Sequence, residues 1–230
     1  MMEYGICCKG PLTPPAQIDL AQAGRYYGLH GSDPAAEALL ARLAPALLAA
    51  AAPRFVCGLY ERQTLGSMLT GRDIEAHLAG CGVCALLGVT LGEGVDRAVR
   101  RAGIGDVAAA MAADALASAL AEQAADEAER LLTARLAGSG LYLTPRYSPG
   151  YGDWPLAAQA RIAALLDLPK NLGVSVTDSF LMLPRKSVTA LLGAADHPVA
   201  GKRAGCASCA LRGRCAYRKR GTTCGKQNDL

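Results

Sequence analysis

An alanine-rich run over residues 106–136 constrains the fold of this 230-residue chain more than any other segment. Alanine has the highest helix propensity, and two glycines at 138 and 140 follow the run as stop signals. The run therefore predicts one long helix. A second helical pattern covers residues 35–51, where Asp33 suits the N-cap and Pro34 suits the first helical position. Shorter helices are predicted at residues 74–78, 92–101 and 156–166.

Short apolar segments between the helical patterns predict strands. They lie at residues 54–62, 83–91, 174–177 and 180–183, and residues 187–193 fit either a last strand or a short helix. A helical interpretation of residues 81–87 is also open. The sequence shows no regular βαβ alternation and no Gly-x-Gly-x-x-Gly motif after a strand. This favours an α+β domain, with a mixed or antiparallel sheet and long helices, over a doubly wound nucleotide fold.

Basic residues concentrate at the C-terminal end of the chain. Residues 201–230 contain eight Lys or Arg and one Asp, whereas residues 1–200 contain 16 Lys or Arg and 19 Asp or Glu. The mildly acidic body argues against a surface built for nucleic acid. The change in composition predicts two parts, a globular domain over residues 1–200 and a basic tail over residues 201–230.

The basic tail carries four clustered cysteines, namely Cys206, Cys209, Cys215 and Cys224. In a chain with no apparent export signal, such a cluster predicts a metal site, and the neighbouring Lys and Arg favour the thiolate form. Four thiolates suit a tetrahedral zinc ion as well as an iron–sulfur cluster, so the spacing leaves the metal open. A basic tail with free cysteines is the alternative.

The remaining signals are weaker. The N-terminus lacks a basic region followed by an apolar stretch, and the uncharged runs at 43–53 and 78–92 are too short to cross a bilayer. We therefore expect a cytoplasmic protein without a membrane segment. Cys81 and Cys84 lie in an apolar run, which favours buried core cysteines. Cys7 and Cys8 adjoin a terminus that we expect to be flexible, and we assign no role to them or to the histidines.

Residues 146–155 concentrate unusual residue types between two helical patterns, with the sequence Arg-Tyr-Ser-Pro-Gly-Tyr-Gly-Asp-Trp-Pro. The Pro-Gly step predicts a type II turn, because glycine accepts the positive φ of the third turn position at little cost. Such a turn offers backbone groups to a ligand, and Arg146 beside it can bind a carboxylate through two parallel bonds. Alternatively, the aromatic residues only seal an edge of the core.

The same segment resembles the Arg-x-x-Pro-Gly-Tyr loop of the activation domain of cobalamin-dependent methionine synthase, and of its stand-alone relatives. Residues 88–92 are similar to a Thr-x-Gly segment of that family. Residues 173–188 are similar to its Leu-Thr-Glu-Ser-x-x-Met-x-Pro-x-x-Ser-Val segment. The resemblance extends over most of residues 3–195. One departure is that the family's tyrosines after the last strand have no counterpart at residues 194–198.

The resemblance implies an S-adenosylmethionine site. It places the family's helix glutamate on Glu122, with Asp126 as the alternative, and places further ligand contacts on Arg146, Ser148, Gly150 and Tyr151. Glu122 also belongs to a polar stripe that recurs every four residues in the long helix, namely Asp114, Ser118, Glu122, Asp126 and Arg130. The spacing alone favours a solvated face with an Asp126–Arg130 pair. No catalytic side chain is assigned.

The implied function is reductive reactivation of a corrinoid-dependent methyltransferase such as methionine synthase, in which cob(II)alamin is reduced and then methylated. The resemblance places the cobalamin on a partner protein and the electron on a donor such as flavodoxin or ferredoxin. Such a role favours an iron–sulfur cluster in the tail. The rival interpretation is a non-enzymatic adaptor whose tail binds zinc and contacts nucleic acid or another protein.

Overall fold

The computed structural model describes residues 4–29, 31–201 and 213–219. Its centre is a five-stranded sheet with the order β1-β2-β3-β7-β4 and antiparallel pairing throughout. The strands of this sheet are β1 (Gly5–Pro11), β2 (Arg54–Glu61), β3 (Val83–Thr90), β4 (Tyr142–Leu143) and β7 (Ser187–Ala195). A separate antiparallel pair consists of β5 (Ser175–Val176) and β6 (Met182–Leu183). The predicted α+β class is confirmed, and residues 187–193 lie in a strand.

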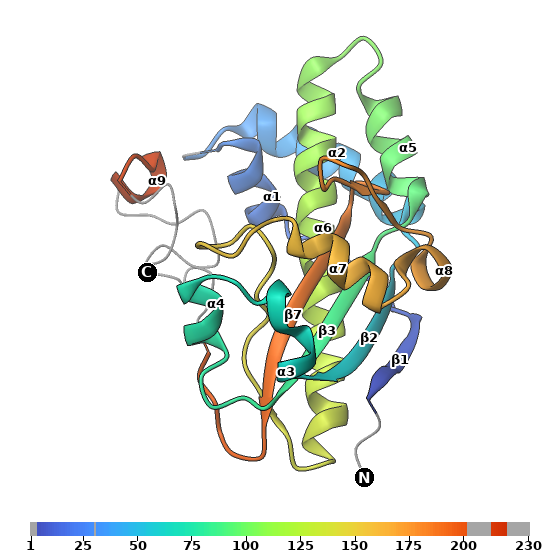
Figure 1. Ribbon diagram of the computed structural model, residues 1–230. Helices are drawn as coiled ribbons and strands as arrows, with labels where there is room; N and C mark the ends of the chain where they lie inside the picture. The colour runs from blue at the N-terminus through green and yellow to red at the C-terminus, as the bar shows by residue number, and fades with distance from the viewer. Residues whose placement is uncertain (1–3, 30, 202–212, 220–230) are drawn as a thin grey trace.

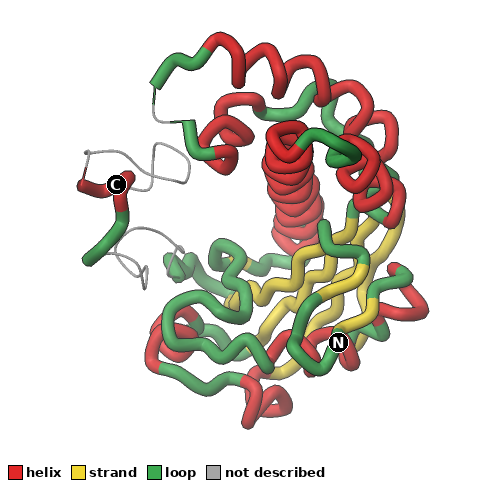
Figure 2. The backbone as a smooth tube through the Cα atoms, turned by 90° about the horizontal axis from the view of Figure 1, so that it is seen from above, coloured by secondary structure: helices red, strands yellow, loops and turns green. Residues whose placement is uncertain are grey.

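A layer of helices that includes the longest ones covers one face of the sheet. It consists of α1 (Leu20–Tyr27), α2 (Pro34–Ala50), α5 (Glu93–Ala102) and α6 (Val107–Ala137). Figure 2 shows α6 almost end-on, lying between the sheet and the other helices of this layer. A large core cluster fills the space between this layer and the sheet.

Shorter helices cover the opposite face, which is in front in Figure 1. They are α3 (Arg62–Leu65), the 3-10 helix η1 (Gly66–Met68), α4 (Arg72–His77), α7 (Ala158–Leu165) and α8 (Leu168–Leu172). They enclose a second core cluster, which includes Tyr147 and Trp154. The tail contributes α9 (Ala216–Lys219). Across the described part of the chain, none of the helices combines the length and the apolar character that crossing a bilayer requires.

The predicted alanine-rich helix is α6, which has 31 residues and is therefore about 46 Å long. The carboxylate of Asp106 caps its first turn by accepting a hydrogen bond from the amide of Ala109 at 2.9 Å. Most of its alanines are buried, and it packs against α1, α2, α5 and β3. Small side chains allow these elements to approach closely on several sides, which explains why a helix in the interior has so few large apolar residues.

The sequence did not reveal β1 and α1. Cys7 and Cys8 therefore lie in a strand of the central sheet, and our expectation of a flexible segment there was wrong. The ends of α1 carry standard signals, because Asp19 caps the first turn and Gly28 adopts a left-handed conformation after the last. The helix has only eight residues, so its apolar pattern is too short to stand out.

Gly193 lies within β7, where close packing of Cys81 and Leu78 leaves no room for a side chain. A Cβ atom on Gly193 would lie 2.6 Å from the sulfur of Cys81 and 2.9 Å from a methyl carbon of Leu78. Gly193 pairs with Cys84 on β3, so the clash would fall in the interior of the sheet. Cys81 and Cys84 are both buried, as predicted.

Replacement of Gly193 by alanine should lower the free energy of unfolding by about 1–3 kcal/mol, because the interior cannot absorb the added methyl group. Gly82→Ala is the matched control, since a Cβ atom there meets nothing within 4 Å. Its effect should stay within about 0.5 kcal/mol. Urea denaturation of both variants measures the difference, and equal stabilities would contradict this packing account.

Candidate functional site

The Pro-Gly segment forms the predicted turn. The amide of Tyr151 donates to the carbonyl of Ser148 at 3.2 Å, and Gly150 has a φ of 90°. This hydrogen bond and the positive φ at the third position match a type II turn. The turn exposes Gly150 and Tyr151, whereas Pro149 is buried.

Two aromatic residues anchor this loop to the body of the protein. The backbone of Tyr147 exchanges two hydrogen bonds of 2.8 Å with that of Leu191 on β7. The indole nitrogen of Trp154 donates to the carbonyl oxygen of Met68 at 2.8 Å, and both aromatic side chains are buried. The aromatic residues thus do seal an edge of the core, and by doing so they hold Arg146 and the turn in place.

Arg146 lies against helix α6 and contacts three carboxylates. Its Nη2 atom is 2.6 Å from Glu122 Oε2, and its Nη1 atom is 2.6 Å from Asp126 Oδ1 and 2.7 Å from Glu129 Oε2. The arginine side chain is 18% exposed, so these contacts are only partly screened by solvent. Asp126 therefore binds Arg146, while Arg130 forms an exposed pair with Glu127.

The charges around Arg146 are unbalanced. Burial alone would lower the pKa of Arg146, but the carboxylates, with Glu122 foremost, outweigh burial and raise that pKa above its ordinary value. Three ionised carboxylates around one guanidinium leave a net charge of about −2. A guanidinium has five N–H donors, and these contacts use three of them. The group can therefore retain all three carboxylates and also donate to a ligand.

A cleft of about 700 Å³ opens beside this cluster, within the range of small-molecule sites. Its lining includes Tyr26 and Tyr27 of α1, Asp114, Ser118 and Glu122 of α6, and Arg185. Burial, the carboxylate of Glu122 and the hydroxyl of Tyr151 all raise the pKa of Tyr26. Tyr26 is therefore near both the acidic cluster and the turn.

Residues 185–187 form a second polar group along α6. The amine of Lys186 is 2.8 Å from Asp114 Oδ1 and donates to Ser118 Oγ at 2.9 Å. Ser187 donates from its hydroxyl to that of Thr90 at 2.9 Å. Lys186 and Arg146, from two of the segments singled out in the sequence, therefore contact successive stretches of α6.

The predicted ligand residues are brought together in part. Glu122 and Arg146 are in contact, and Ser148, Gly150 and Tyr151 form the neighbouring turn. Sequence reasoning missed Glu129, Tyr26, Arg185 and Lys186. Of the predicted metal ligands, Cys206, Cys209 and Cys224 lie outside the described residues, and Cys215 precedes α9. The metal site of the tail stays a prediction.

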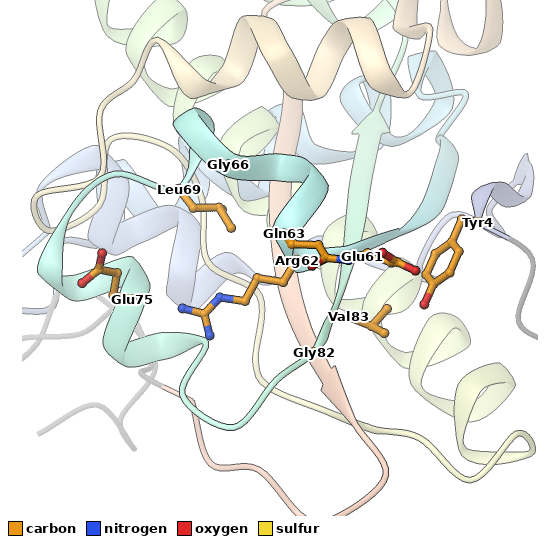
Figure 3. Close-up of a pocket in the computed structure, with 9 residues that line it drawn as sticks. All are labelled: Tyr4, Glu61, Arg62, Gln63, Gly66, Leu69, Glu75, Gly82 and Val83. Carbon is orange, nitrogen blue, oxygen red and sulfur yellow. Dashed lines mark hydrogen bonds between the residues drawn. The ribbon is translucent and has the colours of Figure 1, made fainter.

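A second cavity of about 710 Å³ lies beside α3 and the start of β3 (Figure 3). It is lined by Tyr4, Glu61, Arg62, Gln63, Glu75 and neighbouring residues. The side chain of Arg62 extends across this region and donates to the carbonyl of Leu78 at 2.8 Å. Arg62 therefore connects α3 to the end of α4. None of the predicted ligand residues lines this cavity.

The structure defines the protein as an α+β domain in which a cleft lies beside an acidic cluster and a loop with an arginine and a Pro-Gly turn. The family model for the vitamin B12-dependent methionine synthase activation domain matches residues 81–200. The chain belongs to this family. No curated protein sequence matches it significantly.

A crystal structure of the MetH reactivation domain bound to AdoHcy has a similar fold. Its TM-score is 0.57 at 18% sequence identity, and the match covers 96% of this chain and 88% of that chain. The similarity in fold therefore extends well beyond residues 81–200, which the family model matches. At this level of identity the comparison establishes the shared fold.

The variant Arg146→Ala should lose about 1–3 kcal/mol of stability near neutral pH, less than a fully buried ion pair would lose. Three carboxylates would then repel one another without a cation. The raised pKa keeps Arg146 charged up to strongly alkaline pH, so its stabilising contribution persists across the neutral range.

Denaturation of the wild type and the variant at about pH 7 and about pH 9 tests this expectation. Arg130→Ala is the matched control, because it removes an exposed arginine from the same helix and should change stability little. A deficit for Arg146→Ala that is absent at about pH 7, or that disappears at about pH 9, would contradict this expectation.

Proposed function

We propose that this chain binds S-adenosylmethionine in the cleft between α1 and α6, and that it supports reductive reactivation of a corrinoid-dependent methyltransferase such as methionine synthase. The observation that carries the proposal is the cluster of Glu122, Asp126, Glu129 and Arg146 beside a glycine-containing turn. Membership of the activation-domain family supports it, and so does the similarity in fold to a domain bound to AdoHcy.

The residues at the cleft fit the chemistry of this ligand. S-adenosylmethionine carries a sulfonium and an ammonium group, and a nearby anion favours both. Glu122 lines the cleft and is 31% exposed at its side chain, so it can reach a ligand while it holds Arg146. The excess negative charge of the cluster therefore suits a ligand whose sulfur end is positive.

Arg146 and the turn suit the other groups of the ligand. The remaining N–H donors of Arg146 can bind the carboxylate of S-adenosylmethionine, while Glu122 takes its amino group or ribose hydroxyls. Backbone groups from Ser148 to Gly150 add polar contacts. Tyr151 and Tyr26 offer aromatic surfaces near the cluster, where the family's tyrosines after the last strand are lacking.

The task of these residues is positioning. When bound, S-adenosylmethionine supplies an electrophilic methyl group to the reduced cobalt of a corrinoid held by a partner methyltransferase. A donor such as flavodoxin or ferredoxin supplies the electron for the cobalt. The protein orients the methyl group and excludes water, which lowers the entropic part of the barrier. We assign no catalytic side chain. The proposed role of the four-cysteine tail is to deliver electrons or to dock the partner protein.

The wild-type chain should bind S-adenosylmethionine, and Glu122→Gln should weaken binding by about 10- to 150-fold through loss of a charge-assisted contact. Asp126→Asn should have a smaller effect, because Asp126 contacts Arg146, and Arg146 keeps Glu122 and Glu129 as partners in that variant. Titration calorimetry measures all three proteins.

Glu127→Gln is the matched control, since Glu127 pairs with Arg130 on the surface of the same helix. Its affinity should equal that of the wild type. A larger loss for Asp126→Asn than for Glu122→Gln would transfer the ligand contact to Asp126. Unchanged affinity in both Glu122→Gln and Asp126→Asn would refute the cleft as the binding site.

Replacement of the four tail cysteines by serine in the full chain should leave the affinity for S-adenosylmethionine unchanged, because the cleft is built from residues of the body. The same variant should be impaired in reactivating a corrinoid methyltransferase with its reductant. Calorimetry and a coupled reactivation assay separate the two effects. Full reactivation would remove the tail from the proposed function.

A further inference from the structure

Three cysteine side chains converge at the edge of the central sheet, far from Arg146 in the sequence. Cys7 and Cys8 belong to β1, and Cys57 belongs to β2. Their sulfur atoms all lie within 4.8 Å of one another. Figure 1 shows β1 as the outer strand of the sheet, next to β2.

An irregularity in strand pairing produces this arrangement. Cys8 pairs with Cys57 and Ile6 pairs with Gly58, so Cys7 is an extra residue in β1. Consecutive side chains of a regular strand point to opposite faces, but a β-bulge sets two residues against one on the partner strand. The bulge therefore lets two adjacent cysteines direct their sulfurs toward the same partner.

The spacing of the sulfurs matches that of metal-bound thiolates. Cys7 Sγ is 3.4 Å from Cys57 Sγ and 3.9 Å from Cys8 Sγ. A tetrahedral zinc ion with zinc–sulfur bonds of about 2.3 Å requires sulfurs about 3.8 Å apart. Little movement is thus needed for three thiolates to surround one ion.

A cationic side chain lies near the cluster. Arg135 acts electrostatically on both Cys7 and Cys8. Metal binding would release the protons that the thiols carry. Arg135 of α6 would partly balance the net charge of about −1 that Zn²⁺ and three thiolates carry.

We propose that Cys7, Cys8 and Cys57 form a three-thiolate site for one thiophilic metal ion, represented here by Zn²⁺. The fourth coordination position is then open to water or to an outside ligand. Cys57 is fully buried, whereas Cys7 and Cys8 are half-buried, so an ion can enter from the side of β1. None of its three ligands lines the proposed S-adenosylmethionine cleft or belongs to the tail.

Metal binding at this position would link the outer strand to the sheet. β1 lies at an edge and pairs with β2 only, so a bond through the metal adds a second connection between the strands. An ion that binds the folded chain more tightly than the unfolded chain raises its stability. Added Zn²⁺ should therefore raise the melting temperature.

The test uses the full chain in which Cys206, Cys209, Cys215 and Cys224 are replaced by serine, so that the tail cannot bind the probe. Titration with Co²⁺ under reducing conditions should show one ion per chain, with thiolate-to-cobalt absorption and the visible bands of a tetrahedral site. Zn²⁺ should displace it. In this background, Cys7→Ser and Cys8→Ser should each weaken binding at least about 10-fold.

Cys84→Ala is the matched control, because Cys84 is a buried cysteine of β3 outside the cluster. This variant should bind Co²⁺ as the background does. Absence of Co²⁺ binding in the background protein would overturn the proposal. So would Cys7→Ser and Cys8→Ser variants that bind Co²⁺ as tightly as the background protein does. A Cys7–Cys57 disulfide that persists in reductant would overturn it as well. Calorimetry with S-adenosylmethionine on the same proteins keeps this outcome separate from the proposed function.

Discussion

The contact between Arg146 and three carboxylates connects the Pro-Gly loop to helix α6. Glu122, Asp126 and Glu129 place acidic groups on one face of a helix whose interior positions are mostly alanine. Without a cation these carboxylates would repel one another. Arg146 supplies the cation, so the position of the loop and the charge of the cleft depend on the same interaction.

That interaction requires a fixed loop, and the opposite face of the sheet provides the anchor. Tyr147 and Trp154 are buried in the second core cluster, while Arg146 contacts the carboxylates of α6. One loop therefore has two parts with different roles. Its aromatic residues seal an edge of the core, and its arginine contacts the acidic residues of α6. A loop whose aromatic residues are held in the core can present its arginine and its turn with little conformational freedom.

The sequence indicated the long helix and the Pro-Gly turn, because helix propensity and turn chemistry are local. Glu122 was assigned from the family resemblance, and its contact with Arg146 was not predicted. The sequence failed to identify Glu129. A stripe read at intervals of four leads to Arg130, but at 3.6 residues per turn position 129 lies about 20° from Glu122 and position 130 about 80°. Tyr26 and the cysteine cluster were missed since α1 is short and because a bulge reverses the alternation that strand patterns assume.

A crystal structure of the chain with bound S-adenosylmethionine tests the central claim most directly. Our account places the ligand between α1 and α6, with its carboxylate at Arg146 and its amino group or ribose at Glu122. Arg146 should keep its contacts with the carboxylates of α6 when the ligand is present. A ligand bound elsewhere, for example in the cavity lined by Arg62 and Glu75, with neither Glu122 nor Arg146 in contact, would contradict it.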